Sequence, residues 1–420
     1  MKILLFDPWT VGHHINYAEH LARYFLEQGD EVHLATTKPT GEPYGSALAA
    51  MRSRLPELNI HVTEMTGKPG SRSPLGYHRT MLKTISRGLA LAESSGADVF
   101  HHLYLDHSEI TLYIATRGRA TQASRFATAF KTPSPDRSLS PRGFGHRAHW
   151  LGLGRLLASG DLRALFVHSS QIRDEILEGL GRPDLSPRIT VVPDPVASPP
   201  LMSRQDARKR LGVADAPLML FFGELRESKG ARVLLEALPL LSRDKDWQVL
   251  VAGVPTPAGA EAIRRCKLLL DRDDRLLAHL RYIEDEDIDV YFAAADAVIL
   301  PFLRTHRGTS GILQRAAAAT KPVIASDTGD VGMTVRSREL GMLFEPESAA
   351  SLADAMEDFL ADPPALIRSV ATSAARYSAD SDWRILGSRV RETYLRRASG
   401  MQGDDGENVI SPPHQSPRRE

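Results

Sequence analysis

The stretch LPFLRTHRGTSGILQRAAAATKPVIASD, residues 300–327, decides the fold of this chain. It begins at the end of a predicted strand (296–300) and passes through a loop of small residues. An alanine-rich helix (312–319) and a second strand (322–326) follow. Strand, loop, helix and strand in this order are typical of a parallel sheet with helices packed on its faces. The stretch therefore predicts an α/β domain.

The loop inside this stretch is a candidate cradle for a diphosphate. It consists of Gly308, Thr309, Ser310 and Gly311. Small residues let the backbone come close to a ligand, and the first amides of a helix have no partner inside the helix, so both features favour a bound anion. The alternative is an ordinary connection in which glycine and serine bend the chain and cap the helix.

Short apolar runs alternate with amphipathic helical patterns along the rest of the chain, which predicts two α/β domains. Further strands are predicted at 3–6, 32–35, 99–103, 164–168, 189–192, 218–222, 248–252 and 280–283. Helices are predicted at 15–28, 79–94, 230–241, 260–270, 349–361, 364–379 and 382–397. The proline-rich passage 193–200 separates the two sets. The predicted parts are an N-terminal domain (1–195), a C-terminal domain (196–385), a helix that can return to the N-terminal domain (386–399), and a disordered tail (400–420).

The composition excludes several classes of protein. A chain of 420 residues, with 42% hydrophobic residues and a formal net charge of +0, is typical of a globular protein without overall attraction to nucleic acid. Cys266 is the single cysteine, so neither an internal disulfide nor a cysteine-based zinc site can form. The first apolar run is too short for a secretion signal, and no run approaches the roughly 20 apolar residues of a membrane span. We therefore predict a cytoplasmic protein that does not bind nucleic acid.

Residues 111–160 form a local basic region. They contain eight Arg or Lys residues and one acid, Asp136. The run PSPDRSLSPRGFGHR in the middle of the region predicts a mobile loop. Two interpretations stay open: a solvated surface, or a docking face for an anionic acceptor or for the anionic inner face of a membrane.

A second anion-binding pattern follows the predicted strand 218–222. The sequence FGELRESKG places Arg226 and Lys229 between Gly223 and a helix predicted to start at Gly230. Cations beside a helix N-terminus are unfavourable unless an anion lies between them. Lys229 is therefore the strongest single candidate for ligand binding, against the alternative of a surface lysine paired with a neighbouring glutamate.

These motifs, taken in order, resemble the nucleotide-sugar domain of glycosyltransferase family 4, which has the GT-B fold. The resemblance covers residues 218–352 and rests on the order G-x-L-x-x-x-K-G, VLVAG, Tyr-Ile, AAADAVILP, the small-residue loop and KPVIASDTG. In the N-terminal half the similarity is looser, through Gly12-His13-His14, through ADVFH at 97–101, and through the strand end at 166–170.

The resemblance implies two Rossmann-like domains that face each other across a cleft. It also implies a hexosyltransferase-like enzyme that moves a sugar from a nucleotide-sugar donor to a saccharide or lipid-linked acceptor, with retention of configuration. Cations and amides would stabilise the departing nucleoside diphosphate, so neither a metal nor another cofactor is expected. The implied donor-binding residues are Gly12, His13, Gly223, Arg226, Lys229, Tyr282, Arg307, Gly308, Thr309, Ser310, Gly311 and Arg315, with Tyr282 next to the base.

The chain departs from the family pattern in the donor domain. Two glutamates eight residues apart are usual around the loop, and the matching residues here are Arg307 and Arg315. A carboxylate that would accept hydrogen bonds from ribose hydroxyls has thus become a donor-only guanidinium. The family's arginine after Gly223 is Glu224, and the usual Asn-Gly before the second domain is Asp194-Pro195.

The N-terminal half departs as well. The usual family histidine is replaced by Leu103, which leaves His101, His102 or Asp106 as the candidate catalytic residues. The spacing of the histidines does not match a zinc ligand set.

Two functions therefore stay open. One is an active, divergent glycosyltransferase in which the two arginines hold phosphate or a carboxylated sugar; the other is a non-catalytic nucleotide-sugar or glycan-binding protein. We favour the transferase because the phosphate-compatible residues are kept and the substitutions add anion-binding groups.

Overall fold

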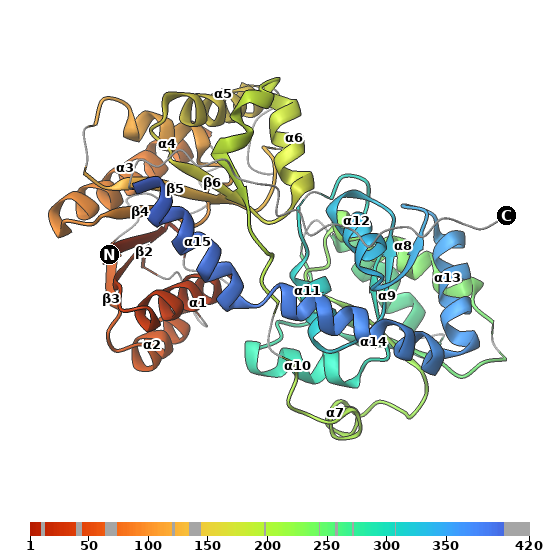
Figure 1. Ribbon diagram of the computed structural model, residues 1–420. Coiled ribbons are helices and arrows are strands. Elements are labelled where there is room, and N and C mark those ends of the chain that lie inside the picture. Colours follow the sequence, from red (N-terminus) through yellow and green to blue (C-terminus); the bar gives the residue numbers. More distant parts are fainter. Residues whose placement is uncertain are drawn as a thin grey trace, which may run out of the picture. The chain divides into compact units, whose positions relative to one another are not determined.

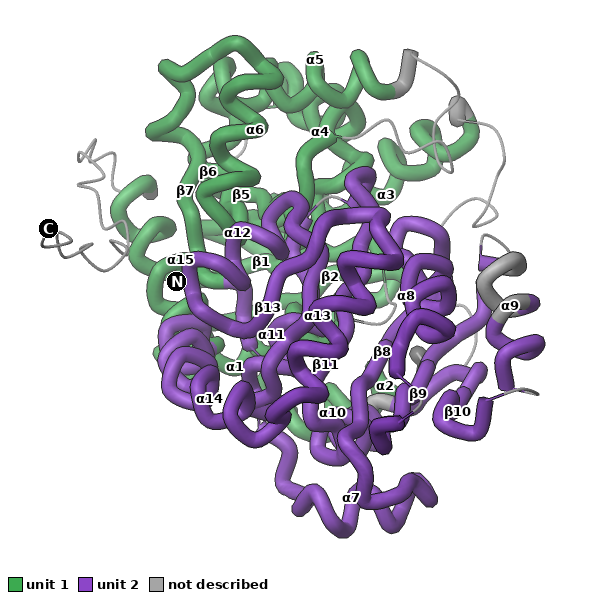
Figure 2. The backbone as a smooth tube through the Cα atoms, turned by 90° about the vertical axis from the view of Figure 1, so that its right-hand side faces the viewer, with its two compact units in different colours: residues 1–193, 383–420 green, residues 194–382 purple. Residues whose placement is uncertain are grey.

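The structure is a computed structural model of the chain. It describes residues 1–9, 13–38, 44–63, 74–119, 122–133, 144–196, 199–242, 244–256, 259–270, 273–306 and 308–398. The chain forms two compact units: unit 1 comprises Met1–Pro193 and Trp383–Glu420, and unit 2 comprises Asp194–Asp382 (Figures 1 and 2). The unit borders lie within about three residues of the predicted domain borders, and the predicted disordered tail lies outside the described residues.

Unit 1 is built on a seven-stranded parallel sheet with the order β3-β2-β1-β4-β5-β6-β7. Its strands are β1 (Lys2–Asp7), β2 (Glu31–Thr37), β3 (Asn59–Thr63), β4 (Val99–His102), β5 (Ser124–Ala129), β6 (Ala164–Val167) and β7 (Ile189–Val191). Its helices are α1 (His13–Glu27), α2 (Tyr44–Arg54), α3 (Pro74–Ser95), α4 (Glu109–Thr116), α5 (Phe144–Ser159), α6 (Ser170–Leu180), the 3-10 helix η1 (Pro183–Arg188) and α15 (Trp383–Ala398).

The last helix of the chain completes the core of unit 1. Leu386, Val390 and Tyr394 of α15 are fully buried in the same cluster as Ile3 and Leu5 of β1. Alternate residues of each central strand face opposite sides of the sheet, and both sides are covered, which explains the almost continuous apolar runs. Unit 1 therefore requires segments from both ends of the chain.

Unit 2 is built on a six-stranded parallel sheet with the order β10-β9-β8-β11-β12-β13. Its strands are β8 (Leu218–Phe222), β9 (Gln248–Ala252), β10 (Leu276–His279), β11 (Ala297–Leu300), β12 (Val323–Ser326) and β13 (Gly341–Phe344). Its helices are α7 (Arg204–Leu211), η2 (Glu227–Lys229), α8 (Ala231–Ala237), η3 (Leu238–Leu240), α9 (Ala260–Leu270), α10 (Asp285–Ala294), α11 (Gly311–Ala318), α12 (Gly329–Arg338), α13 (Ala349–Ala361) and α14 (Pro363–Asp380).

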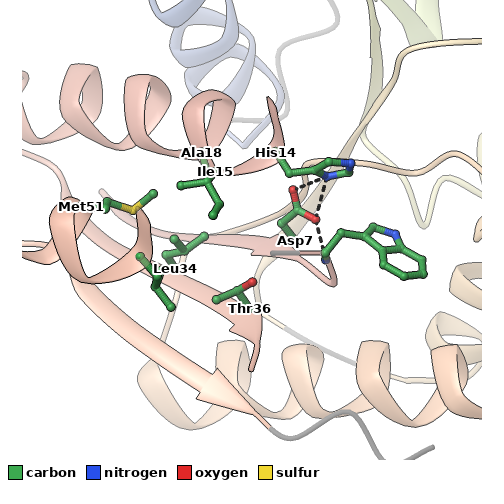
Figure 3. A pocket seen from close by; sticks show the side chains of 9 residues that line it. Asp7, His14, Ile15, Ala18, Leu34, Thr36 and Met51 are labelled. Carbon is green, nitrogen blue, oxygen red and sulfur yellow. Dashed lines mark hydrogen bonds and ion pairs between the residues drawn. The ribbon is translucent and has the colours of Figure 1, made fainter. Parts of the chain in front are cut away.

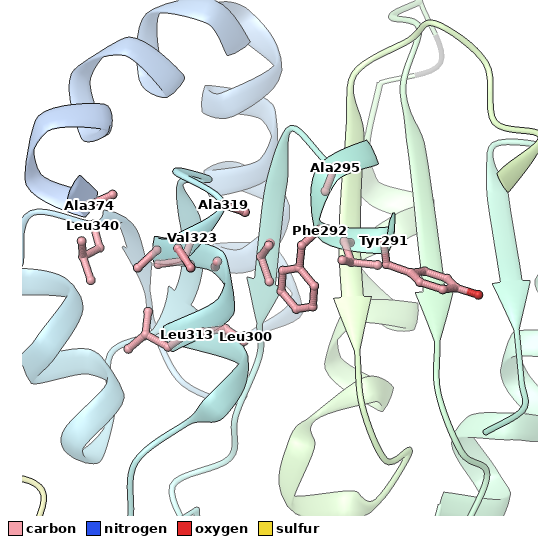
Figure 4. Packing of buried hydrophobic residues seen from close by; sticks show 14 of the residues in the cluster. Tyr291, Phe292, Ala295, Leu300, Leu313, Ala319, Val323, Leu340 and Ala374 are labelled. Carbon is pink, nitrogen blue, oxygen red and sulfur yellow. The ribbon is translucent and has the colours of Figure 1, made fainter. Parts of the chain in front are cut away.

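The core of unit 2 lies on both faces of this sheet. Val298 and Leu300 of β11 belong to one buried cluster, and Ala297 and Ile299 belong to the other. Figure 4 shows the first cluster, in which Leu313 of α11 and other apolar side chains pack against the sheet. Two Rossmann-like α/β units follow, as predicted.

Two predictions of local structure need correction. The predicted strand 280–283 is loop, because β10 lies four residues earlier and pairs Leu276 with Val249. The basic region 111–160 contains most of α4, all of β5 and α5, and thus more regular structure than expected. Most of the run predicted as a mobile loop lies outside the described residues, and its last residues begin α5.

Candidate functional site

Two predicted ligand segments of unit 2 lie at the topological switch point of its sheet. The strand order reverses between β1 and β4 in unit 1, and between β8 and β11 in unit 2. In open α/β sheets, ligands bind outside the carboxyl ends of the strands at such a reversal. The turn at Gly223 to Gly230 follows β8, and the small-residue loop follows β11, so both face the expected side of unit 2.

Close packing of backbone shapes the turn after β8. Gly230 has a φ of +70°, and a Cβ atom there would lie 1.6 Å from the carbonyl oxygen of Pro301. A Cβ atom at Gly253 would lie 1.9 Å from the carbonyl oxygen of Gly223. The Leu303 amide donates a hydrogen bond of 3.1 Å to the Ser228 carbonyl. The contacts of Gly230 and Ser228 hold the turn against the first residues after β11, and that of Gly253 holds it against the segment after β9.

Lys229 ends the 3-10 helix η2 within this turn. Its ammonium nitrogen lies 4.2 Å from the ring centroid of Phe302, a cation–π contact. Burial, and after it the nearby charge of Arg226, lower the pKa of Lys229 to about 7, and Glu224 opposes the shift. An anion beside the amine would restore its proton, so the residue suits a diphosphate.

Arg226 lies in the same turn and is only weakly paired. Its side chain is 46% exposed and lies 3.8 Å from the carboxylate of Glu224. Exposed pairs of this kind are worth at most about 1 kcal/mol. Breaking the pair with Glu224 therefore costs little free energy, so Arg226 can turn towards an anionic ligand.

The small-residue loop after β11 begins α11. Gly308 has a φ of +89°, which favours glycine. Ser310 caps the helix, because its hydroxyl accepts a hydrogen bond of 3.4 Å from the Leu313 amide. Gln314, within α11, donates a hydrogen bond of 2.7 Å from Nε2 to Oδ2 of Asp194. The first turn of α11 thus presents amides without helical partners beside a fixed loop.

The structure gives Arg315 a partner that the sequence did not indicate. Its Nη1 lies 3.1 Å from Oδ1 of Asp289 on α10. The positive charge that replaces the family's glutamate is therefore largely matched by a carboxylate. Tyr282 lies in the loop after β10 and is 38% exposed.

Three predicted donor-site positions cannot be placed. Gly12 and Arg307 lie outside the described residues. His13 is the first residue of α1, and its side chain is likewise outside the described part.

The two candidate catalytic histidines of β4 have structural surroundings. His101 and His102 are both fully buried, and burial lowers the pKa of each to about 3, so both are neutral. The ring nitrogens of His101 are hydrogen-bonded to Tyr394 and Thr128. Those of His102 interact with Ser108 and with the backbone amide of Tyr104. With both nitrogens of each ring engaged, the geometry favours a positioning role over the predicted catalytic one.

Asp106 is the third candidate, and its surroundings differ. Its Oδ1 accepts a hydrogen bond of 3.1 Å from the Phe130 amide, whereas its buried Oδ2 has no partner among the described residues. Burial raises the pKa of Asp106 to about 7. The carboxyl can therefore keep a proton near neutral pH and donate a hydrogen bond, as an acid at a reacting centre does.

A buried Asp–His pair lies at the end of β1, and sequence reasoning did not find it as a pair. His14 Nδ1 lies 3.0 and 3.2 Å from the two oxygens of Asp7, as Figure 3 shows. The cavity beside the pair is about 10 Å³, lined mainly by apolar side chains such as Leu34 and Met51. That space holds roughly one water molecule, so it is too small for a substrate. The clue in the sequence was an aspartate at a strand end followed seven residues later by a histidine.

Neither a metal cluster nor a membrane span occurs in the part of the chain that the structure describes. Within those residues, no three His, Cys, Asp or Glu side chains are grouped so that they could hold a metal ion. No described helix combines the length and the apolar character needed to cross a bilayer.

Comparison with known proteins follows the same division of the chain. The profile of the family "Glycosyl transferases group 1" matches residues 216–362, within unit 2. Glycogen synthase of Mycobacterium tuberculosis is 30% identical over 243 residues, which cover 56% of this chain and 55% of that protein. D-inositol 3-phosphate glycosyltransferase of Corynebacterium diphtheriae is 27% identical over 195 residues, 45% of each chain. The matches thus span about half the length of these relatives.

The fold itself extends over the whole chain. HepE of Anabaena, solved in complex with UDP, superposes with a TM-score of 0.71 at 16% sequence identity, covering 94% of this chain and 100% of that one. Such a likeness shows the GT-B fold with its two Rossmann-like units. The family profile and the relatives show that residues 216–362 are similar to group 1 glycosyltransferases, and the chain as a whole has the GT-B fold.

Proposed function

We propose that the protein transfers a sugar from a nucleotide-sugar donor, and that unit 2 binds the diphosphate of the donor. The observation that carries this proposal is Lys229, a desolvated amine next to the segment that leads into the start of α11. A cation of lowered pKa and free helix amides at one switch point form an anion site. Gly223, Arg226 and residues 308–311 complete it.

The chemistry follows from this arrangement. The acceptor hydroxyl attacks the anomeric carbon of the sugar, the bond from that carbon to the diphosphate oxygen breaks, and the hydroxyl proton is released. Negative charge grows on the departing diphosphate, where Lys229 and the amides stabilise it more strongly than in the bound donor. Retention of configuration at the anomeric carbon belongs to the proposal, as does transfer without a metal.

We further propose a neutral hexose as the transferred sugar and a saccharide or lipid-linked acceptor. Related structures of HepE hold UDP and UDP-glucose, and the relatives include a glycogen synthase. The pairing of Arg315 with Asp289 leaves less uncompensated positive charge for a carboxylated sugar than the sequence suggested. This feature supports a neutral donor sugar.

In unit 1, Asp106 is the proposed polar contact to a substrate. It is the one of the three candidates whose side chain keeps a polar atom without a hydrogen-bond partner among the described residues. As a protonated carboxyl it would donate a hydrogen bond to a sugar oxygen. Tyr282 and Arg315 stay proposed neighbours of the nucleoside, and Gly12, His13 and Arg307 stay proposed on the sequence alone.

The test is thermal stabilisation of the purified protein by UDP, ADP, GDP and their sugars, followed by mass spectrometry for slow hydrolysis of the best donor. Stabilisation with hydrolysis supports an active transferase. Stabilisation without hydrolysis, and without transfer to any of a panel of saccharide acceptors, favours the alternative of a binding protein. No response to any nucleotide contradicts the donor site.

A membrane partner is proposed on a separate observation. Ile114 of α4 and Leu151 of α5 are 52% and 56% exposed, and exposed Arg147 and Arg155 lie four residues either side of Leu151. The described part of these two helices holds one acid, Glu109, which is buried against His149. An apolar and cationic face of this kind suits an anionic bilayer surface at the cytoplasmic side.

Flotation with vesicles tests that partner. The wild type should bind phosphatidylglycerol vesicles and release them at high salt. It should not bind phosphatidylcholine vesicles. The double variant I114S/L151S should bind several-fold more weakly. If the wild type and the double variant bind phosphatidylglycerol vesicles equally, these apolar residues do not contact the membrane, and the result favours a solvated surface.

A further inference from the structure

Phe302 is a buried residue of unit 2 to which the proposed function gives no role. It lies two residues after the end of β11 and is 2% exposed. The ammonium nitrogen of Lys229 lies 4.2 Å from the centroid of its ring. The imidazole of His306 packs against the same ring at a centroid distance of 4.1 Å. One side chain therefore contacts both the strongest candidate cation of the donor site and the last described residue before the small-residue loop.

Backbone hydrogen bonds fix the position of this ring relative to the amine. The Ser326 hydroxyl, at the end of β12, donates a hydrogen bond of 2.6 Å to the carbonyl of Phe302. The next amide along the chain, that of Leu303, donates to the carbonyl of Ser228 at 3.1 Å. Ser228 directly precedes Lys229. The segment that carries the ring and the turn that carries the amine are thus joined one residue away from the contact itself.

The amine of Lys229 lacks an acidic partner among the residues that the structure describes. Its nitrogen forms neither an ion pair nor a hydrogen bond there, and Glu224 of the same turn lies 3.8 Å from Arg226 instead. A desolvated ammonium group without a counterion is unfavourable. An aromatic face attracts a cation through its quadrupole, and more strongly where water is excluded. The ring of Phe302 therefore provides part of the stabilisation that a carboxylate would otherwise provide.

An aromatic partner suits a ligand-binding amine better than a carboxylate does. A carboxylate would accept hydrogen bonds from the ammonium group and would repel a diphosphate. A phenyl ring has neither an acceptor oxygen nor a net charge. It can therefore hold the cation in place while the N–H donors of Lys229 stay available for the ligand.

We propose that Phe302 is the positioning residue of Lys229: its ring takes the place of an acidic partner and holds the ammonium group in the donor site for the diphosphate. This inference rests on the proposed function, because it assumes that Lys229 binds the diphosphate. The ring also opposes loss of the proton. Burial lowers the pKa of Lys229 to about 7, and a neighbour that favours the charged form keeps this pKa from falling further.

Fluorinated phenylalanines test the ring with little change of its size. Fluorine withdraws electrons from the face of the ring and weakens its attraction for a cation. Mono-, di- and trifluorophenylalanine in place of Phe302 should therefore lower the pKa of Lys229 in steps. At pH 8 the Kd for UDP should rise in the same steps, to about 3- to 10-fold with the trifluoro residue. At pH 6, where the amine is protonated in any case, the Kd should rise about twofold or less. F302L, which removes the ring but stays apolar, should resemble the trifluoro protein.

Two further proteins separate this effect from others. Arg226 and Glu224 carry charges near the amine, and His306 can titrate against the ring. In K229M, which lacks the amine, the trifluoro residue at position 302 should change the Kd less than twofold at either pH, because an effect through the other groups would persist. The matched control is trifluorophenylalanine in place of Phe359, a ring of α13 that is 1% exposed and has no cation against it among the described residues. It should bind UDP like the wild type.

The experiment is titration calorimetry of the full chain with UDP and with inorganic pyrophosphate at both pH values, with melting temperatures for every protein. A stepwise loss of affinity at pH 8 that disappears in K229M supports the inference. An unchanged Kd with the trifluoro residue at position 302, or an equal loss in the K229M background, overturns it and leaves the proposed function intact. If the wild type binds neither ligand, the proposed function fails, and the inference with it. If F302L does not fold, the fluorinated proteins still decide the outcome.

Discussion

Tyr394 on the last helix and His101 on β4 share a hydrogen bond of 2.5 Å, although 293 residues separate them in the chain. Both side chains are fully buried, and burial raises the pKa of Tyr394 well above its usual value while lowering that of His101 to about 3. The phenol therefore keeps its proton and donates a hydrogen bond to Nδ1 of the neutral imidazole. The Nε2–H of His101 is then left to donate to the hydroxyl of Thr128.

Removal of this phenol should destabilise unit 1 without touching the donor site. Y394F leaves a buried ring nitrogen without a partner, which costs about 1–3 kcal/mol. We expect a lower melting temperature and an unchanged Kd for UDP, measured by calorimetry. Y113F, which removes a less buried phenol on α4, is the control. An unchanged melting temperature in Y394F would show that the hydrogen bond between Tyr394 and His101 contributes little to stability.

Lys229 should dominate the binding of the diphosphate. K229M keeps the apolar stem on Phe302 and removes only the charge, so it should weaken UDP about 10- to 100-fold, the worth of a charge-assisted hydrogen bond. Titration calorimetry measures the loss. K209M, at an exposed lysine of α7, is the matched control and should bind like the wild type. Equal affinities in the two variants would remove Lys229 from the site.

Binding should also move a proton. Because the pKa of Lys229 is about 7 in the free protein, most molecules carry a neutral amine at pH 8. A diphosphate stabilises the charged form, so binding takes up as much as one proton per site and affinity falls as the pH rises above 7. Calorimetry at pH 8 with UDP-glucose, in two buffers of different ionisation enthalpy, reports the uptake. K229M should take up no proton on binding. If K229M takes up as much as the wild type, the proton binds to another group.

Asp106 makes a prediction about stability and pH. Its pKa is about 7 in the folded protein and near 3.8 in the unfolded chain, so the folded state holds the proton more tightly between these values. Stability therefore falls as the pH rises through this window and levels off above 7. D106N has no such loss: its stability relative to the wild type should rise by at most about 3 kcal/mol between pH 4.5 and pH 8.

Thermal unfolding at both pH values measures the difference. D161N, at the aspartate paired with Arg125, is a control on another carboxylate of unit 1. A D106N variant that is less stable than the wild type at pH 8 would mean that the ionised carboxylate has a partner.

The pair of Arg315 and Asp289 allows a charge exchange. R315E alone places two carboxylates side by side and should lower stability by up to about 1 kcal/mol, and the double variant R315E/D289R should recover it. UDP affinity should change less in R315A than in K229M, because the guanidinium is already matched by Asp289. A larger loss in R315A would restore Arg315 as a principal donor contact.

The fold of unit 2 was predictable because local signals agreed with each other. Apolar runs of four or five residues, each followed by a helix, mark β8, β9, β11 and β12 correctly. β13 was not predicted, and β10 was misplaced because RLLAHLRYIED contains two candidate runs, of which the second has the better β-propensity. Pairing with β9 selects the first run, and a contact between distant segments leaves no local trace.

Parts of unit 1 were missed for similar reasons. Arg125 interrupts the apolar pattern of β5, yet its guanidinium is buried and donates to the Arg119 carbonyl at 2.7 Å. In α5, Gly152 argues against a helix, but a Cβ atom there would lie 2.4 Å from Cα of Ile110, so the glycine serves close packing against α4. Composition alone suggested a flexible basic segment at both places.

The site was predicted in its residue types better than in its geometry. A lysine near a strand end can be found by inspection, but its contact with Phe302 depends on how two loops meet. The same holds for Asp194, which is separated from Gln314 by 120 residues. Partners of this kind arise from the fold, so a single sequence marks them only as departures from a pattern.

The return of α15 to unit 1 has a consequence for synthesis on the ribosome. Unit 2 lies between the two segments of unit 1, so all of its strands and helices emerge before residues 383–398 exist. Unit 2 can fold while translation continues. The apolar side chains of unit 1 that pack against Leu386, Val390 and Tyr394 stay uncovered until α15 has been synthesised. The nascent N-terminal half is thus the part most exposed to aggregation or chaperone capture, and a stop codon shortly after residue 382 would leave a folded donor unit attached to an unfinished partner.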